Sequence, residues 1–272
     1  MTIWLRVKDL AVTFPRTGKE PQDSAVKGID FDVARGESVG IVGEIGSGKS
    51  VTAKAIAGLL PPSARVSGDI RLQGHSLLAG DRNTLAALRA PVSYIFQNPK
   101  AALDPVFTIG SQLVETLRWR QRLGTAAAVE RAVALLDAVG IPEPETRLRE
   151  FPHTLSGGMA QRVMIALSLA CEPELLIADE PTSALDVSIQ AQILSLLGEL
   201  RRQRGASLIF ISHDLSAVAE LCDRVIVMHA GRAVEAGPTR AVIGNPTHPY
   251  TRSLIDAIPR RPQARQDDEP AN

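Results

Sequence analysis

The 272-residue sequence has few cysteines and no net charge. Its two cysteines, Cys171 and Cys222, show no CxxC or Cys/His ligand spacing, so a disulfide framework or a zinc site is not expected. We interpret both as small buried hydrophobic residues. Thirty basic and thirty acidic side chains cancel, which gives no support for a nucleic-acid-binding surface, and we expect no nucleic-acid partner.

The sequence also lacks long apolar runs. No stretch of eighteen consecutive apolar residues occurs, and residues 1–14 lack the apolar core and cleavage site of a signal peptide. We therefore expect a cytosolic chain without a membrane span, whose membrane role would come through a partner. Hydrophobic residues nevertheless make up 44% of the chain, enough for a sizeable core.

Short apolar runs alternate with helical patterns, which predicts an α/β fold. Four runs, at residues 39–42, 92–96, 175–178 and 208–211, are each followed directly by polar residues. Such runs are typical of strands buried on both faces of a parallel sheet. Because ligands gather at the carboxyl ends of parallel strands, the four runs predict one shared site.

Between about residues 98 and 155 the pattern becomes mostly helical. Apolar residues at helical spacing predict two amphipathic helices with the inward-facing residues Leu113, Leu117, Val129, Val133 and Leu136. A glycine and two prolines between positions 140 and 144 end the second helix. Residues from about 260 onward mix arginines, prolines and acids, and we expect a disordered tail there.

Residues 43–50, GEIGSGKS, fit the phosphate-binding pattern G-x-x-x-x-G-K-S/T between a predicted strand and a predicted helix. The glycines let backbone N–H groups approach a polyphosphate, Lys49 supplies a positive charge, and the Ser50 hydroxyl is a Mg²⁺ ligand. The expected nucleotide-binding residues are Gly43, Glu44, Ile45, Gly46, Ser47, Gly48, Lys49, Ser50 and Val51. The alternative is a glycine-rich turn that matches by chance.

Residues 175–180, LLIADE, form an apolar run that ends in two carboxylates. Asp179 is a candidate Mg²⁺ ligand, and Glu180 is a candidate general base for an attacking water. An acidic strand end without function is the alternative. Together with the phosphate-binding loop, this run predicts a nucleotide hydrolase or switch.

A second candidate anion-binding turn, LSGGM at 155–159, is followed by Gln161 and Arg162. This segment resembles the signature of ATP-binding-cassette (ABC) ATPases. Further matches follow in family order over roughly residues 3–237. They are Phe14 as the aromatic that stacks on adenine, Gln97 as the Q-loop glutamine, SALD at 183–186 as the D-loop, and His213 as the switch histidine.

The resemblance implies a P-loop NTPase (RecA-like) core with a mostly parallel sheet, an N-terminal antiparallel β region and a helical insert. It implies one ABC ATPase domain over residues 1–272. Its expected parts are an α/β core (1–97 and 161–237), a helical subdomain with the signature motif (98–160) and a C-terminal extension (238–272).

The resemblance also implies a site shared between two cassettes, with ATP and Mg²⁺ as cofactors. Ser156, Gly157 and Gly158 would contact the γ-phosphate held by a partner, and Asp186 would communicate across the dimer. The expected catalytic residues are Glu180, His213 and Gln97, and the expected metal-site residues are Ser50, Gln97 and Asp179. Two residues depart from the usual pattern: Ile45, a mainly backbone position, and Ala160, whose small side chain is expected to weaken contact with the partner.

Residues 245–259, NPTHPYTRSLIDAIP, resemble the C-terminal segment of importer ATPases for dipeptides, oligopeptides and nickel. This implies two transmembrane permeases, a second and similar ABC ATPase subunit, an indirect extracytoplasmic solute-binding protein, and a peripheral location on the cytoplasmic face of the membrane. No cysteine-containing tail follows this segment, which moves some weight from ordinary peptides towards nickel or metal chelates without deciding the solute. The segment itself is expected to pack on the core without chemistry, since His248 is far in sequence from every phosphate motif.

The expected function is therefore ATP hydrolysis that drives uptake of peptides or metal chelates through permeases. The alternatives are a soluble ABC ATPase acting in DNA repair or translation, and a P-loop kinase. Arg118, Arg120 and Arg122 flank Trp119, which indicates either a permease docking surface or a solvated helix face. The solute, and whether the partner ATPase is a copy or a paralogue, stay open.

Overall fold

The computed structural model describes residues 2–15, 23–183 and 185–257. Its larger sheet has six strands in the order β10-β9-β3-β8-β7-β6. Their bounds are β3 (Ser38–Val42), β6 (Val92–Ile95), β7 (Leu175–Asp179), β8 (Ser207–Ile211), β9 (Arg224–His229) and β10 (Arg232–Pro238). Every pair is parallel except β9–β10, so the predicted parallel core and its four strands are confirmed.

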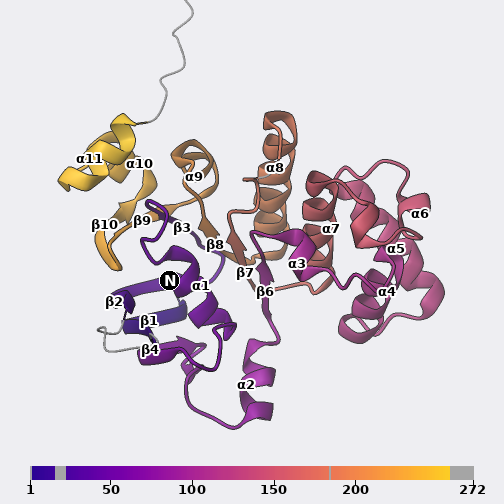
Figure 1. Ribbon diagram of the computed structural model, residues 1–272, viewed down its shortest axis with the longest axis horizontal. Helices are drawn as coiled ribbons and strands as arrows, with labels where there is room; N and C mark the ends of the chain where they lie inside the picture. Colours follow the sequence, from indigo (N-terminus) through magenta and orange to yellow (C-terminus); the bar gives the residue numbers. More distant parts are fainter. Residues whose placement is uncertain (1, 16–22, 184, 258–272) are drawn as a thin grey trace, which may run out of the picture.

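A second, antiparallel sheet has the order β2-β1-β4-β5. It is formed by β1 (Ile3–Phe14), β2 (Asp23–Ala34), β4 (Arg65–Leu72) and β5 (His75–Ser76). Figure 1 shows this sheet beside helix α1, on one side of the parallel core. The antiparallel β region implied by the resemblance is thus present.

Helices connect and cover the strands of the two sheets. Their bounds are α1 (Lys49–Ala57), α2 (Arg82–Arg89), α3 (Pro99–Ala102), α4 (Ile109–Arg120), α5 (Thr125–Ala138), α6 (Pro144–Arg147), the 3₁₀ helix η1 (Pro152–Thr154), α7 (Gly157–Ala170), α8 (Val187–Arg204), α9 (Leu215–Leu221), α10 (Thr239–Gly244) and α11 (Pro249–Asp256). Figure 1 shows α4, α5 and α6 gathered at one end of the molecule and α10 and α11 at the opposite end.

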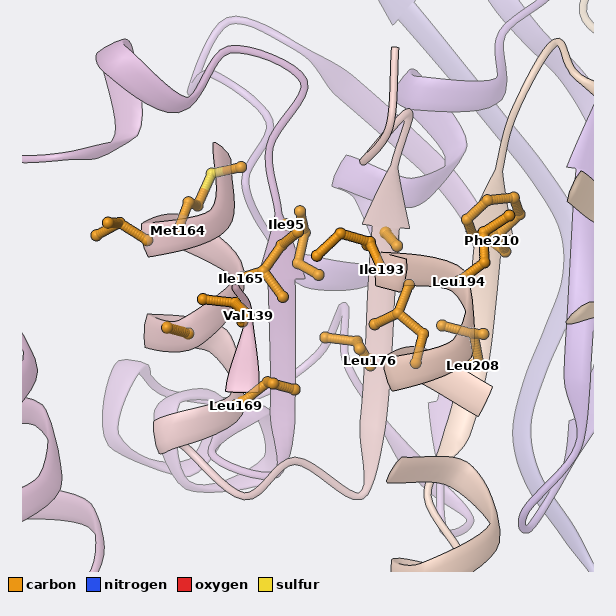
Figure 2. Close-up of a cluster of buried hydrophobic side chains, with 14 of the residues drawn as sticks. Ile95, Val139, Met164, Ile165, Leu169, Leu176, Ile193, Leu194, Leu208 and Phe210 are labelled. Carbon is orange, nitrogen blue, oxygen red and sulfur yellow. The ribbon is translucent and has the colours of Figure 1, made fainter. Parts of the chain in front are cut away.

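Both faces of the parallel sheet are buried, because successive side chains of a strand point to opposite faces. In β7, Leu176 and Ala178 join the core under α7 and α8, whereas Leu175 and Ile177 join the core shared with α1 and the antiparallel sheet. Figure 2 shows the first of these cores, with Leu176 packed among side chains of the neighbouring helices and strands. This two-sided burial explains why the strands read as unbroken apolar runs.

The structure confirms the two predicted helices of the insert but corrects the buried face of the second. Leu113, Leu117 and Leu136 are fully buried as predicted, whereas Val129 is exposed and Val133 is only partly buried. The buried face of α5 is instead built largely on small residues, Ala128 and Ala132. Since α5 packs against both α4 and α7, small side chains at these positions let the helices approach closely.

The proposed domain division stays a prediction, although α7 runs without a break across its boundary at residue 160. Cys222 is buried as predicted, but Cys171 is only partly buried. In the described part of the chain no helix is long and apolar enough to cross a membrane, and no group of His, Cys, Asp or Glu forms a metal cluster. The expected disordered tail lies outside the described residues.

Candidate nucleotide-binding site

The loop at residues 43–50 joins β3 to α1 and is shaped by glycines that no other residue could replace. Gly43 and Gly48 have φ angles of 150° and 100°. A Cβ on Gly43 would lie 2.1 Å from the Met228 carbonyl oxygen, and one on Gly48 would lie 2.5 Å from the Ala25 carbonyl oxygen. Both glycines are therefore required by the close packing of the loop within its own chain.

Lys49 lies inside this loop with only 5% of its surface exposed. Its Nζ donates hydrogen bonds to the carbonyl oxygens of Gly43 and Glu44, each at 2.8 Å. Burial lowers the pKa of Lys49, while the nearby carboxylates of Glu180, Asp179 and Glu44 oppose that shift. The loop backbone therefore holds the Lys49 ammonium group through two of its carbonyl oxygens.

The beginning of α1 offers further donors. Its N-cap is Gly48, no side chain caps the first turn, and no acidic residue lies in that turn. The first N–H groups of a helix have no intrahelical acceptor and attract anions. Among the described residues the buried Ser47 hydroxyl has no hydrogen-bond partner, which leaves one more donor in the loop. This set of donors fits the phosphates of a nucleoside triphosphate.

Asp179 ends β7 and is 2% exposed. One of its carboxylate oxygens accepts a hydrogen bond from Ser50 Oγ at 2.8 Å, and the other accepts one from Tyr94 Oη at 2.7 Å. Burial, followed by the charge of Asp179, raises the pKa of Tyr94 and keeps its phenol protonated as a donor. The adjacent hydroxyl and carboxylate oxygens of Ser50 and Asp179 fit a Mg²⁺ ion.

Glu180 follows immediately, in the left-handed region with a φ angle of 48°. Such a conformation costs a non-glycine residue about 1 kcal/mol and is concentrated at functional sites. Its carboxylate accepts a hydrogen bond from Gln97 Nε2 at 2.8 Å and lies 3.6 Å from His213 Nδ1. A carboxylate held by two polar side chains is suited to take a proton from a water molecule.

Most of these groups line one cavity of about 830 Å³; Ser47 and Asp179, both predicted site residues, and Tyr94 are not part of its lining. Its lining comes from the carboxyl ends of β3, β6, β7 and β8, as the sequence predicts, together with two residues that the sequence did not indicate. The lining residues are Ala25, Gly43, Glu44, Ile45, Gly46, Gly48, Lys49, Ser50, Val51, Gln97, Glu180, His213 and Leu254. The structure therefore brings most of the predicted site residues together, while their individual roles stay predictions.

Other predicted site residues do not line this cavity. Ser156 is exposed and caps α7 by accepting a hydrogen bond from the Met159 N–H at 3.3 Å. Gly157 and Gly158 form the first turn of that helix, and Asp186 is exposed and caps α8. Phe14 is partly buried at the end of β1, against the core shared with α1.

The two departures from the family pattern also have defined positions. Ile45 is 98% exposed at the tip of the phosphate-binding loop, so its side chain makes little contact within the chain. Ala160 is fully buried in α7 and lies inside the helical packing. Its side chain therefore does not share the exposed surface of Ser156, and the expected loss of partner contact stays untested.

Sequence reasoning missed two tyrosines. Tyr94 contacts Asp179 from the neighbouring strand, because β6 pairs with β7. Tyr250 lies in the C-terminal segment, where we expected packing without chemistry, yet its hydroxyl oxygen accepts a hydrogen bond from the Glu44 N–H of the phosphate-binding loop. His248 itself caps α11, as a packing role predicts. No local pattern marks either tyrosine, since both contacts are made only in the folded chain.

Two family models match the chain. The model described as ABC transporter matches residues 26–183, and the one described as oligopeptide/dipeptide transporter, C-terminal region, matches residues 234–272. The chain is 48% identical over 257 residues to the oligopeptide transport ATP-binding protein OppD of Escherichia coli, covering 94% of this chain and 76% of that protein. It is 47% identical over 259 residues to the dipeptide transport ATP-binding protein DppD of Bacillus subtilis, covering 94% and 77%.

Solved structures agree with the fold. A dimeric post-hydrolysis state of the ATP-binding cassette MJ0796, bound to ADP and Pi, superposes with a TM-score of 0.78 at 27% identity, covering 87% of this chain and 99% of that one. The subunit cbiO1 from Clostridium perfringens, part of the ABC transporter complex cbiONQ, gives a TM-score of 0.72 at 30% identity, covering 90% and 92%. With the loop, the acidic strand end and the cavity described above, these matches show that the chain belongs to the ABC transporter ATP-binding family and is an ATPase.

Proposed function

We propose that the chain is the ATP-hydrolysing subunit of an importer for oligopeptides or dipeptides. The main support for the substrate class is that residues 234–272 match the family model described as oligopeptide/dipeptide transporter, C-terminal region. The relatives OppD and DppD are also named for peptide transport. Of the two solute classes that we expected, those names support peptides and not nickel or metal chelates. They also give no support to a role in DNA repair or translation.

For hydrolysis, bound ATP supplies the triphosphate and Mg²⁺ neutralises part of its charge. Lys49 and the N-terminus of α1 hold the phosphates, and Ser50 and Asp179 hold the cation. Glu180 accepts the proton of the attacking water, while the side chains of Gln97 and His213 orient that water and the terminal phosphate. The support is that Gln97 and His213 both approach the Glu180 carboxylate in the cavity that Lys49 lines.

The catalytic site is completed by the signature turn of a second cassette. In this chain Ser156 and Gly157 are exposed, outside the lining of the cavity formed by the chain's own phosphate-binding loop. A solved relative in a post-hydrolysis state is dimeric. We propose that Ser156, Gly157 and Gly158 contact the γ-phosphate held by the partner, with Asp186 close to the junction. The partner is a copy of this chain or a similar, non-identical ATPase.

A groove in the helical subdomain is the proposed docking surface for permeases. It has a volume of about 620 Å³ and is lined in part by Phe107 and Trp119. These side chains are 53% and 76% exposed, a large apolar surface for a monomer. The Arg120 guanidinium lies 5.3 Å from the Trp119 ring centroid, and the groove lining includes the acidic residues Asp104 and Glu115. The exposure of Trp119 supports docking over a partly buried packing role, and docking would place the chain at the cytoplasmic face of the membrane.

Affinity purification from membranes tests the assembly. We expect a tagged chain to recover two polytopic membrane proteins and a second ABC ATPase, and Trp119→Glu to lose the membrane proteins while its thermal unfolding midpoint is unchanged. Recovery of ribosomes or DNA in their place would contradict the proposal. In cells, deletion of the chain should abolish uptake of a labelled tripeptide; loss of nickel uptake alone would assign metal chelates as the solute.

A further inference from the structure

We propose that Tyr250 is a positioning residue for nucleotide binding, which holds the first peptide of the phosphate-binding loop in place from the C-terminal segment. This inference rests on the binding of ATP by that loop. Glu44 N–H donates a hydrogen bond to the Tyr250 hydroxyl oxygen at 2.9 Å, across 206 positions of sequence. The contact makes α11, the helix of the peptide-transporter region, a structural neighbour of the nucleotide site.

The hydrogen bond acts on one particular peptide unit. The N–H of Glu44 and the carbonyl of Gly43 belong to the same planar peptide group. That carbonyl oxygen accepts a hydrogen bond from Lys49 Nζ at 2.8 Å. Tyr250 therefore fixes the orientation of the peptide that holds the Lys49 ammonium, and a rotation of this peptide would move the Lys49 acceptor away.

The loop is braced on the same side by a second contact. The N–H of Gly231, in the turn between β9 and β10, donates to the Ser47 carbonyl oxygen at 3.1 Å. His229, two residues earlier, lies against Tyr250, with 4.0 Å between the ring centroids and 37° between the ring planes. The β9–β10 turn and Tyr250 thus form one support, which contacts the loop at both Glu44 and Ser47.

The C-terminal segment is itself fixed to the core. The Glu235 carboxylate on β10 accepts hydrogen bonds from Thr247 N–H and Thr247 Oγ1, each at 2.8 Å, and from His248 N–H at 3.0 Å. These bonds anchor the chain just before α11. Leu254, one turn after Tyr250, lines the nucleotide cavity directly. Because α11 is anchored in this way, Tyr250 can hold the backbone of Glu44, an exposed residue of the loop.

The test removes the Tyr250 hydroxyl and keeps its ring. In the full chain, Tyr250→Phe should raise the dissociation constant of a fluorescent ATP analogue with Mg²⁺ by about twofold to tenfold, the worth of one neutral hydrogen bond. The turnover rate at saturating ATP should stay within about twofold, because the catalytic groups are untouched. Ser253→Ala is the matched control, because it removes a hydroxyl of the same helix that bonds only to the Tyr250 carbonyl.

A purely structural role would lower the thermal unfolding midpoint in both variants and shift nucleotide affinity equally in both; that result would overturn the proposal. An unchanged dissociation constant in folded Tyr250→Phe would also overturn it. Glu44→Pro removes the N–H donor, so Tyr250→Phe should have no further effect in that background; if Glu44→Pro does not fold, the single variant decides. Failure of the wild-type chain to bind ATP would instead refute the proposed function.

Discussion

The chain contains two glycine-rich turns that each lead into a helix, and they differ in what surrounds them. In the phosphate-binding loop before α1, a Cβ on Gly43 would collide with backbone 2.1 Å away. In the signature turn, which opens α7, a Cβ on Gly157 would meet no described atom within 4 Å, and the φ angle of Gly157 is not positive. Gly43 is thus enclosed by its own chain, whereas Gly157 is open.

The difference shows where the need for glycine arises. At Gly43 the fold of this chain requires it, because no side chain fits beside Met228. At Gly157 neither sterics nor backbone conformation within the described chain requires it. An alanine there would even favour the helix. The open space at Gly157 leaves room for close approach by another molecule, as the proposed contact with a second cassette requires.

The largest effect is expected from a change that leaves both turns intact. Glu180→Gln removes the proposed general base, so ATP hydrolysis should fall by about 10²- to 10⁴-fold while ATP binding is kept. With hydrolysis blocked, the two turns should stay closed on the same nucleotide, and light scattering should detect an ATP-dependent dimer. Hydrolysis at the original rate would show that Glu180 is not the base.

The next prediction separates the two turns directly. Gly157→Ala should reduce ATP hydrolysis by about tenfold or more, because the proposed contact with the partner's nucleotide needs close backbone approach. It should keep ATP binding and the wild-type unfolding midpoint, since none of the described residues lies within 4 Å of the added Cβ.

Gly43→Ala, in the phosphate-binding loop, is the variant to compare with Gly157→Ala. It should lose ATP binding as well as hydrolysis. Nucleotide titration and thermal unfolding of both variants check the pair. Loss of ATP binding in Gly157→Ala, or wild-type hydrolysis by it, would contradict the assignment of the open turn to a partner.

A smaller effect is expected at the proposed cation site, which Ser50 and Asp179 form. Tyr94→Phe removes one of the two donors that orient the Asp179 carboxylate. Loss of such a supporting hydrogen bond should raise the Mg²⁺ concentration for half-maximal hydrolysis by about tenfold. The ATPase rate measured over a Mg²⁺ titration checks this, and an unchanged midpoint would show that Ser50 alone orients Asp179.

The smallest effect concerns the anchor of the C-terminal segment. Burial opposes ionisation of Glu235, but hydrogen bonds, among them those from Thr247 and His248, outweigh it and lower its pKa to about 2. A carboxyl group with a lowered folded-state pKa contributes stability above its ordinary pKa, near 4.5, and loses that contribution as the pH falls towards 2. Wild type should therefore be slightly more stable than Glu235→Gln at pH 7, and urea unfolding should show the difference shrinking as the pH falls below 5. A difference that does not change with pH would exclude the charge as its cause.

Much of this arrangement is readable in the sequence where local pattern and chemistry coincide. The strands of the parallel sheet are apolar runs because both faces are buried. Asp179 and Glu180 stand at the end of β7, and Lys49 follows the glycine-rich loop after β3. The buried face of α5 is not readable, because the preference for Ala128 over Val129 depends on how closely α4 and α7 approach. Tyr250 is hidden for a similar reason: only the folded chain brings α11 to the loop.

The short connection between α7 and β7 links two proposed parts of the nucleotide site. The helix has 14 residues, so it forms a rod about 20 Å long, and nine of those residues are buried. A four-residue connection, 171–174, joins it to β7, which ends at Asp179. One short segment of chain therefore carries Ser156, proposed to contact a partner's nucleotide, at its outer end and Asp179, the proposed cation ligand, at its inner end. We predict that a displacement of the signature turn also displaces Asp179.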